Sequence, residues 1–352
     1  MRPQSPELDV VPGVASGIIA PEIDDLSLEE EVLETKMTEM LGVKYPVQCG
    51  TMHGLTTAEV TAPLAEAGCF CCLPAAYYET KQGLLDEVKK VRDQTDQPFG
   101  INVGLFPEMR VTVTAEERID WVIESGVKIL ETAGRSPESQ RKQIADGGLI
   151  HIHKCARVRD AIKAEKVGVD IVSIVGTECG GHPSMEEVGF IVLIPATLDA
   201  ISVPLIAGGG ICDGRSLIAS LALGAAGVNI GTRFMATKDF PIHQDFKDKL
   251  VEFDEKDTLL VMKSLKNPSR VLKTAWSEKI LELENKQATL EELAPLISGS
   301  VSGEGWRDGA VEEGMYPGGQ VIGRIHDLPT MSELVERIVA EAVEAKGAIA
   351  RL

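Results

Sequence analysis

The most constraining feature of this chain is a regular alternation of short apolar runs with longer amphipathic stretches, from about residue 46 to about residue 232. Eight runs have the length and residue types of strands: "PVQCG", "CFCCLPAA", "PFGINVG", "VKILETA", "LIHIHKC", "VDIVSIVG", "VPLIAGGG" and "GVNIGT". Strands that are apolar on both faces are typical of a parallel sheet covered by helices. Eight such units within about 200 residues favour a (β/α)8 TIM barrel over an open doubly wound sheet.

The regions outside this alternation predict further parts of the fold. A capping-type Ser27 is expected to begin a helix that ends at Gly42. The sequence "PTMSELVERIVAEAVEAKG" predicts a closing amphipathic helix. The expected parts are a flexible N-terminal tail (1–25), the barrel core (26–240), a mostly helical insertion (241–315) and a closing segment whose C-terminal helix returns to the barrel (316–352).

The charge balance limits the classes of partner. Lys and Arg number 35 against 54 Asp and Glu, for a formal net charge of −19. This charge argues against nucleic acid or an anionic membrane surface, so a bound anion is expected to be held by backbone amides or a few placed cations. The N-terminus lacks the pattern of a signal peptide, and no apolar run approaches the roughly 20 residues of a membrane span. The seven cysteines, of which Cys69, Cys71 and Cys72 lie in one predicted strand, predict buried thiols in a reduced, cytoplasmic protein.

Glycines follow the last two predicted strands. In a (β/α)8 barrel the active site lies at the carboxyl ends of the strands, and the loops after strands seven and eight form a recurring phosphate site. "AGGGICDGRS" places Gly209 and Gly210 ahead of a helix that Asp213 is expected to cap, and "NIGTRF" places Gly231 and Thr232 after the eighth run. Glycines let backbone N–H groups approach an anion, although either cluster alone could simply end a strand. Together the two clusters favour a phosphate site.

Other predicted strand ends supply polar or polarisable side chains. Met52 could line a pocket floor, Asn102 offers an amide, and Lys154 could stabilise negative charge on a reduced flavin, although a lone Lys at a strand end is usually solvated. His151 and His153 are expected on one face of their strand, but no third ligand at suitable spacing supports a metal site.

One histidine follows the sixth predicted strand, in "GTECGGHPSMEEVG". An imidazole with a pKa near 6.5 can accept a proton at neutral pH, so His182 is a candidate base; the alternative is a solvated loop residue. Ser184 and Glu187 match a capping box, which predicts a helix start just after His182. Cys179 is expected to have a small packing role.

Six motifs of the sequence together resemble those of a known family. The motifs are "YPVQCGTMHGLTTAEVTAPLAEAG", "PFGINVGLFP", "IHKC", "VDIVSIVGTECGGHPS", "VPLIAGGGICDGRSLIASLALGAAGVNIGTRFMAT" and "GGQVIGRIHD". In this order they resemble the nitronate monooxygenases, or 2-nitropropane dioxygenases, which are FMN-dependent TIM-barrel enzymes. The resemblance runs from about residue 38 to about residue 340.

The resemblance implies a role for each matching residue. His182 falls on the family's catalytic base, which removes the α-proton of a nitroalkane or helps to hold its nitronate. The FMN phosphate is expected to contact Gly209, Gly210, Gly231 and Thr232. The flavin ring is expected to contact Met52, Asn102, Lys154 and the backbone near Gly176. Gly181 is expected to leave space for the flat cofactor, and Gln320 to lie near the flavin.

The implied activity is oxidation of a nitronate or nitroalkane by O2 to a carbonyl compound and nitrite. The substrates are then small molecules, and the enzyme could be a homo-oligomer.

The sequence departs from the family pattern near the first strand. Gly50 and Thr51 stand where relatives often have a proline, and His53 is an uncommon neighbour of Met52. The "GGH" motif is also similar to that of FMN-dependent enoyl-acyl-carrier-protein reductases, which use a nicotinamide. A flavin-binding barrel without catalytic activity is a third interpretation.

Overall fold

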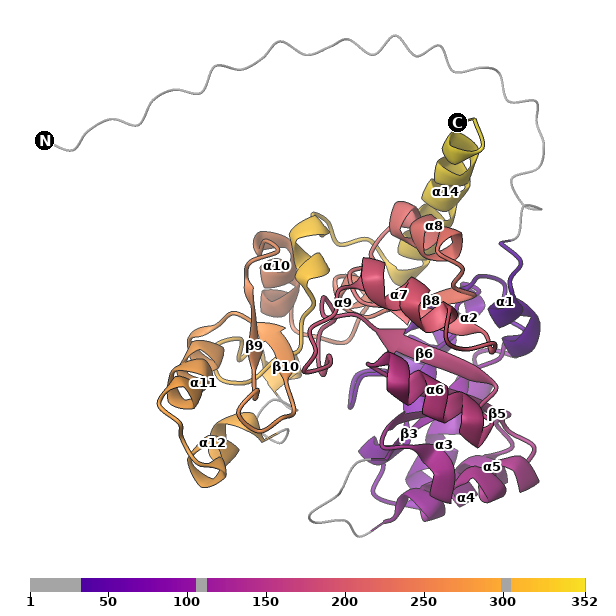
Figure 1. Ribbon diagram of the computed structural model, residues 1–352, viewed down its shortest axis with the longest axis horizontal. Coiled ribbons are helices and arrows are strands. Elements are labelled where there is room, and N and C mark those ends of the chain that lie inside the picture. Colours follow the sequence, from indigo (N-terminus) through magenta and orange to yellow (C-terminus); the bar gives the residue numbers. More distant parts are fainter. Residues whose placement is uncertain (1–32, 106–112, 299–304, 352) are drawn as a thin grey trace, which may run out of the picture. The chain divides into compact units, whose positions relative to one another are not determined.

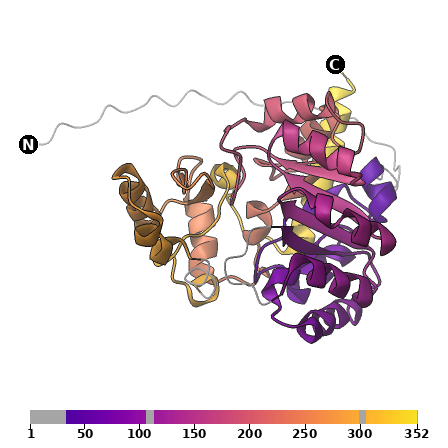
Figure 2. The same ribbon diagram turned by 60° about the horizontal axis from the view of Figure 1, so that its bottom comes forward.

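The computed structural model describes residues 33–105, 113–298 and 305–351. Its core is one sheet of eight parallel strands in the order β1-β8-β7-β6-β5-β4-β3-β2, with helices around it (Figures 1 and 2). The strands are β1 (Val47–Cys49), β2 (Cys72–Pro74), β3 (Gly100–Leu105), β4 (Ile129–Gly134), β5 (Ile150–Cys155), β6 (Ile171–Val175), β7 (Leu205–Gly208) and β8 (Gly227–Ile230). Every strand lies within one residue of a predicted run, and the predicted (β/α)8 fold is confirmed.

A short bridge brings the two edge strands of this sheet together. Gln48 of β1 pairs in parallel with Phe70, just before β2. The Phe70 N–H donates to the Val47 carbonyl, and the Cys49 N–H donates to the Phe70 carbonyl, both at 2.8 Å. The sheet therefore closes into a barrel, which leaves no long unpaired edge.

Helices follow the strands because the connecting stretches bury one apolar stripe each. In α4, for example, Ile119 and Val122 are buried, Thr114 and Glu117 form a capping box, and Gly126 ends the helix in the left-handed conformation. The helices of the barrel are α1 (Lys36–Leu41), α2 (Ala58–Glu66), α3 (Lys81–Arg92), α4 (Ala115–Ser125), α5 (Arg141–Asp146), α6 (Val158–Val167), α7 (Phe190–Leu198) and α8 (Gly214–Ala222), with 3-10 turns η1 (Ala75–Tyr77) and η2 (Pro137–Ser139).

The first described helix, α1, starts later than predicted. Thr35 is its N-cap and Gly42 its C-cap, as expected at that end. The predicted cap Ser27 and the predicted tail 1–25 lie outside the described residues.

The barrel interior is filled by an apolar layer at the amino ends of the strands. This layer contains Met37 of α1 and side chains from five of the strands or their edges: Phe70, Cys72, Ile129, Ile152, Ile171 and Ile206. Two residues further along β4 and β5 the inward positions become polar, with Glu131 and Lys154. The interior therefore changes from a sealed floor to a polar layer as the strands approach their carboxyl ends.

The chain between β8 and the last helix forms a lobe, part of which has a small core of its own centred on Val261, Val271 and Ile280. β9 and β10 pair antiparallel, which was not predicted from the sequence, because both strands are short and flanked by charged residues. The elements after β8 are α9 (Thr232–Met235), α10 (Gln244–Glu252), β9 (Thr258–Val261), β10 (Ser269–Leu272), α11 (Ala275–Asn285), α12 (Leu290–Ile297), η3 (Gln320–Arg324) and α14 (Met331–Ile349).

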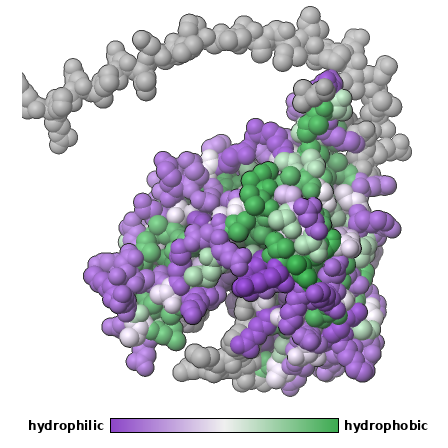
Figure 3. All heavy atoms as spheres, in the orientation of Figure 1, coloured by the Kyte–Doolittle hydropathy of each residue, from purple (hydrophilic) through white to green (hydrophobic). Residues whose placement is uncertain are grey.

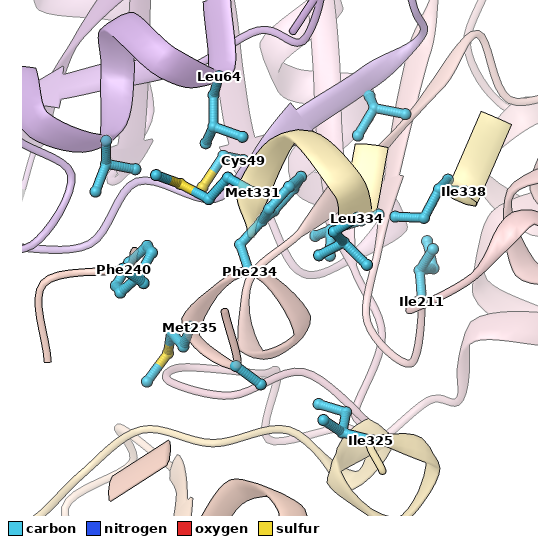
Figure 4. Close-up of a cluster of buried hydrophobic side chains, with 14 of the residues drawn as sticks. Cys49, Leu64, Ile211, Phe234, Met235, Phe240, Ile325, Met331, Leu334 and Ile338 are labelled. Atoms are coloured by element: carbon cyan, nitrogen blue, oxygen red, sulfur yellow. The ribbon is translucent and has the colours of Figure 1, made fainter. Parts of the chain in front are cut away.

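The closing helix α14 packs on the barrel. Figure 4 shows Met331, Leu334 and Ile338 of α14 in one cluster with Phe234 of α9 and Cys49 of β1. The predicted closing amphipathic helix is therefore present, and it buries its apolar stripe against the outside of the barrel beside α8.

Helix α7 carries no charged residue and exposes Ile191 and Val192, at 66% and 60% of their surface. The hydrophobic area near the centre of Figure 3 coincides with this helix. An exposed apolar area of this kind is typical of a surface that contacts another molecule. Within the described residues, none of the helices combines the length and apolar character that a membrane crossing requires.

Candidate active site

A pocket of about 860 Å³ opens at the carboxyl ends of the barrel strands. Its wall includes residues that follow β1, β5, β7 and β8, together with residues of the lobe such as Asn267, Pro268 and Trp306. Pockets that hold cofactors and small molecules usually measure roughly 300–1,000 Å³. The pocket is therefore large enough for a cofactor and lies where this fold places its chemistry.

Most of the predicted site residues meet in this pocket. Its wall contains Met52, Asn102, Lys154, Gly181, His182, Gly209, Gly210, Gly231 and Thr232. Gly176 and Gln320 are not part of the wall. The Gly176 N–H donates to the Gly208 carbonyl, and the Gln320 N–H donates to the Glu178 carbonyl, both at 2.9 Å. The roles assigned to all eleven residues stay predictions.

The glycines after β7 and β8 form a cradle of backbone groups. Gly209 and Gly210 have φ angles of 99° and 74°, which favour glycine. A Cβ atom at Gly231 would have no heavy atom within 4 Å, so the backbone borders open space. Among the described residues, no backbone acceptor takes the N–H groups of Gly210 or Gly231. Unpaired amides beside open space suit an anion.

The amino end of α8 does not extend this cradle. Asp213 is the N-cap as predicted, and its carboxylate accepts from the Ser216 N–H at 2.8 Å. The Gly214 N–H donates to a Glu341 carboxylate oxygen of α14 at 2.9 Å. Because these amides already have acceptors, the donors for an anion come from the glycine turn and the start of α9.

A buried carboxylate that was not predicted lies at the pocket floor. Glu131 of β4 is fully buried and accepts four hydrogen bonds. The donors and their distances are Gln48 Nε2 at 2.6 Å, Asn102 Nδ2 at 2.7 Å, Thr51 Oγ1 at 2.9 Å and Lys154 Nζ at 3.1 Å. The signal in the sequence was an acidic residue inside the apolar run "VKILETA", since a charge in a parallel strand has to be paired. Asn102 and Lys154 thus belong to one network rather than to two separate strand ends.

His151 and His153 do share one face of β5, as predicted, but that face is turned away from the pocket. Ile152, between them, packs in the barrel interior. The Thr132 hydroxyl lies 2.7 Å from His151 Nε2 and 2.8 Å from His153 Nδ1. Both imidazoles are therefore structural groups between the sheet and its helices.

The loop that carries His182 is clamped by the lobe. The Gly181 N–H donates to the Arg270 carbonyl at 3.0 Å, and the Arg270 N–H donates to the Gly181 carbonyl at 2.6 Å. The Arg270 guanidinium also donates through Nε to the Thr177 carbonyl at 2.9 Å. Arg270 of β10 thus holds both ends of the segment 177–181, which precedes His182 directly.

The hydrogen bond of the ring determines which nitrogen of His182 can act as a base. Nδ1 lies 3.0 Å from the Pro268 carbonyl oxygen. Because a carbonyl oxygen only accepts, Nδ1 carries the hydrogen in the neutral ring and Nε2 takes up the proton. The His182 side chain reaches solvent at the pocket mouth. Its pKa is nevertheless lower than the ordinary value, because loss of hydration on the side of the ring that faces the protein outweighs the hydrogen bonds with Pro268 and Asn267, which raise the pKa. The ring is therefore neutral at pH 7 and ready to accept.

The predicted capping box after His182 is wrong. The Glu187 N–H donates to the Ser184 carbonyl at 3.2 Å, and Glu187 has a φ of 49°, so the segment forms a turn. The next helix, α7, begins only at Phe190, whose N–H donates to the Glu178 carboxylate. His182 is held by β10 and Pro268 instead of by a helix start. Cys179, for which a packing role was expected, lies in the pocket wall; loss of hydration raises the pKa of its thiol to about 12, so it is not activated as a nucleophile.

Comparisons with known proteins agree with this geometry. A family model described as nitronate monooxygenase matches residues 34–341. A probable nitronate monooxygenase of Staphylococcus aureus (strain MSSA476) is 30% identical, over 71% of this chain and 81% of that protein. The (3aS,4S,5R,7aS)-5-hydroxy-7a-methyl-1-oxo-octahydro-1H-indene-4-carboxyl-CoA dehydrogenase of Rhodococcus jostii (strain RHA1) is 29% identical, over 91% of this chain and 99% of that protein. The structure of FabK from Thermotoga maritima has a TM-score of 0.84 and 29% identity, over 90% of this chain and 99% of that chain.

Proposed function

This chain belongs to the nitronate monooxygenase family of flavin oxidoreductases, and on that premise we propose that it oxidises alkyl nitronates or nitroalkanes with FMN and O2 to a carbonyl compound and nitrite. The observation that carries the proposal is the position of His182. Its ring stands at the mouth of the pocket that also contains the glycine cradle and Lys154. One pocket thus combines a neutral base, an anion site and a cation.

The residues of the pocket fit FMN. The unpaired amides of Gly210 and Gly231 suit a phosphate group, with Gly209 in the same turn. Thr232 adds a hydroxyl that accepts from the Gly319 N–H at 2.9 Å and keeps its own hydrogen for donation. Asn102, Lys154 and Met52 would border the ring. When bound, FMN would supply the electron acceptor that is reoxidised by O2.

The protein's own part in the reaction is proton transfer and charge stabilisation. His182 Nε2 takes the α-proton of a neutral nitroalkane, which leaves the substrate as a nitronate anion and the ring as a cation. The adjacent imidazolium and the backbone amides of the loop stabilise this anion. A nitronate supplied directly has already lost the proton, so it needs His182 only for orientation.

The test is an oxygen-consumption assay on the FMN-loaded protein. We expect O2 uptake and nitrite release with propyl-2-nitronate, and slow reduction of the flavin by NADH. Rapid reduction by NADH without any effect of the nitronate would contradict the proposal. A protein that stays colourless after incubation with FMN would contradict it as well.

A second candidate is a nicotinamide-dependent oxidoreductase that acts on an acyl thioester. It is favoured by the match to the Rhodococcus jostii protein, which is named as a dehydrogenase of a carboxyl-CoA and is matched over 99% of its length. The same assay separates the two functions, because this candidate requires rapid electron transfer between NAD(P)H and the flavin.

A further inference from the structure

Glu131 is a buried acidic side chain below the pocket for which the proposed reaction gives no role. It comes from β4, is fully buried, and lies directly beneath Asn102 and Lys154 in the hydrogen-bond network. A buried carboxylate costs free energy unless it is paired and hydrogen-bonded. Its presence inside a buried strand therefore needs a reason.

The network keeps this carboxylate ionised. Burial alone raises the pKa of Glu131, but the Lys154 ammonium and hydrogen bonds from Gln48, Lys154 and Asn102 outweigh it, so the net pKa is below its ordinary value. The Lys154 side chain is 19% exposed and 3.1 Å from Glu131, so its charge is largely compensated from below while it remains open to the pocket above.

Glu131 also determines which end of the Asn102 amide faces the pocket. A carboxylate only accepts, so the group that lies 2.7 Å from it has to be the NH2 of Asn102. The amide carbonyl is consequently the end that a bound ligand meets. A ring N–H of the ligand would find an acceptor there.

We propose that Glu131 is a positioning residue that acts on bound FMN through Lys154 and Asn102: it compensates part of the Lys154 charge, orients the Asn102 carbonyl, and so keeps the reduction potential of the flavin lower than Lys154 alone would set it. The proposal rests on the FMN site of the proposed function. Its physical basis is that a cation beside the flavin ring favours the reduced form, which carries more negative charge. A carboxylate in contact with that cation opposes the effect.

The surroundings of Glu131 allow a nearly isosteric test. Glu131→Gln removes the charge and keeps one acceptor oxygen for Thr51, Asn102 and Lys154. The new NH2 group would face Gln48 Nε2, but the buried Oε1 of Gln48 has no partner among the described residues. A flip of the Gln48 amide turns that oxygen towards the new donor. The variant is therefore expected to fold and to bind FMN.

The experiment measures the two-electron midpoint potential by dye equilibration, and FMN affinity in both redox states, on the FMN-loaded protein. In Glu131→Gln we expect reduced FMN to gain about tenfold in affinity over oxidised FMN, a rise of about 30 mV. Lys154→Met should shift the potential in the opposite direction. The double variant Glu131→Gln/Lys154→Met should return towards the wild type, because both charges are gone.

The matched control is Glu87→Gln, which removes another buried carboxylate, on α3, away from the pocket wall. Its potential should equal that of the wild type. A merely structural Glu131 would weaken both redox states of FMN equally and leave the potential unchanged, which overturns the proposal while the proposed function stands. Failure of the wild type to bind FMN overturns both.

Discussion

Two buried imidazoles predict a steep loss of stability between pH 7 and pH 5. Burial lowers the pKa of His151 from 6.5 to about 3, with a smaller contribution from His153. Burial likewise lowers the pKa of His153 from 6.5 to about 4. The Thr132 hydroxyl has one hydrogen, so it donates to the unprotonated nitrogen of one ring and accepts from the N–H of the other. Protonation of the ring that accepts this hydrogen would break one of the two hydrogen bonds.

The direction and magnitude of this pH-dependent change in the free energy of unfolding follow from the difference in pKa between the folded and the unfolded protein. Both pKa values are depressed in the folded protein, so the unfolded chain binds the protons first and stability is lost as the pH falls below about 6.5. At pH 5 each ring is still neutral in the fold but protonated in the unfolded chain. The cost is about 2 kcal/mol for each ring, or about 4 kcal/mol for the pair, at about 1.4 kcal/mol per pH unit.

The assay is urea unfolding at several pH values between 7.5 and 5, with a fixed excess of FMN. The matched variant His151→Asn/His153→Asn keeps polar groups at both positions but does not titrate in this range. We expect the wild type to lose about 4 kcal/mol relative to the variant, whatever their difference at pH 7.5. Parallel pH profiles for the two proteins would refute the assignment of neutral buried rings.

Three further predictions concern the pocket. His182→Asn should keep FMN bound but lose about 10²–10⁴-fold in kcat on neutral nitroalkanes, and much less on nitronates, in oxygen-uptake assays; equal losses would argue against proton abstraction. Gly231→Val should weaken FMN binding at least tenfold in a fluorescence titration, because the new side chain would enter the open space of the cradle. The control Gly347→Ala on α14 should leave FMN binding unchanged and stabilise the helix by roughly 0.5–1 kcal/mol. Arg270→Lys should reduce nitroalkane turnover by about tenfold with FMN affinity within about twofold, since it frees the Thr177 carbonyl and loosens the loop before His182; unchanged turnover would show that the clamp is dispensable.

The local pattern of the chain was enough to predict the barrel. The apolar runs are too short for helices and apolar on both faces, and hydrophobic burial leaves few other arrangements for eight of them. The cradle glycines were predictable for a related reason, since the fold itself brings the ends of β7 and β8 to one side. Asp213 could be recognised as a cap because capping depends on residues three positions apart.

Other features depend on residues far apart in the sequence. Nothing near Gly181 indicates that Arg270 pairs with its backbone, and the Ser184 and Glu187 pattern suggested a helix that is absent. The antiparallel pair β9–β10 was missed because its strands are short and polar at their ends, so the pattern of the lobe indicated helices.

The number and order of the strands, the glycine turns and the histidine after the sixth strand could be predicted from the sequence, because they follow from periodicity and from backbone preferences within a few residues. How those residues act depends on contacts that form only in the folded protein. The tertiary structure joined Glu131 to Gln48, 83 positions away, and set the tautomer of His182 through Pro268, 86 positions away. A hydrogen bond depends on distance and direction in space, and closure of the barrel and docking of the lobe create both.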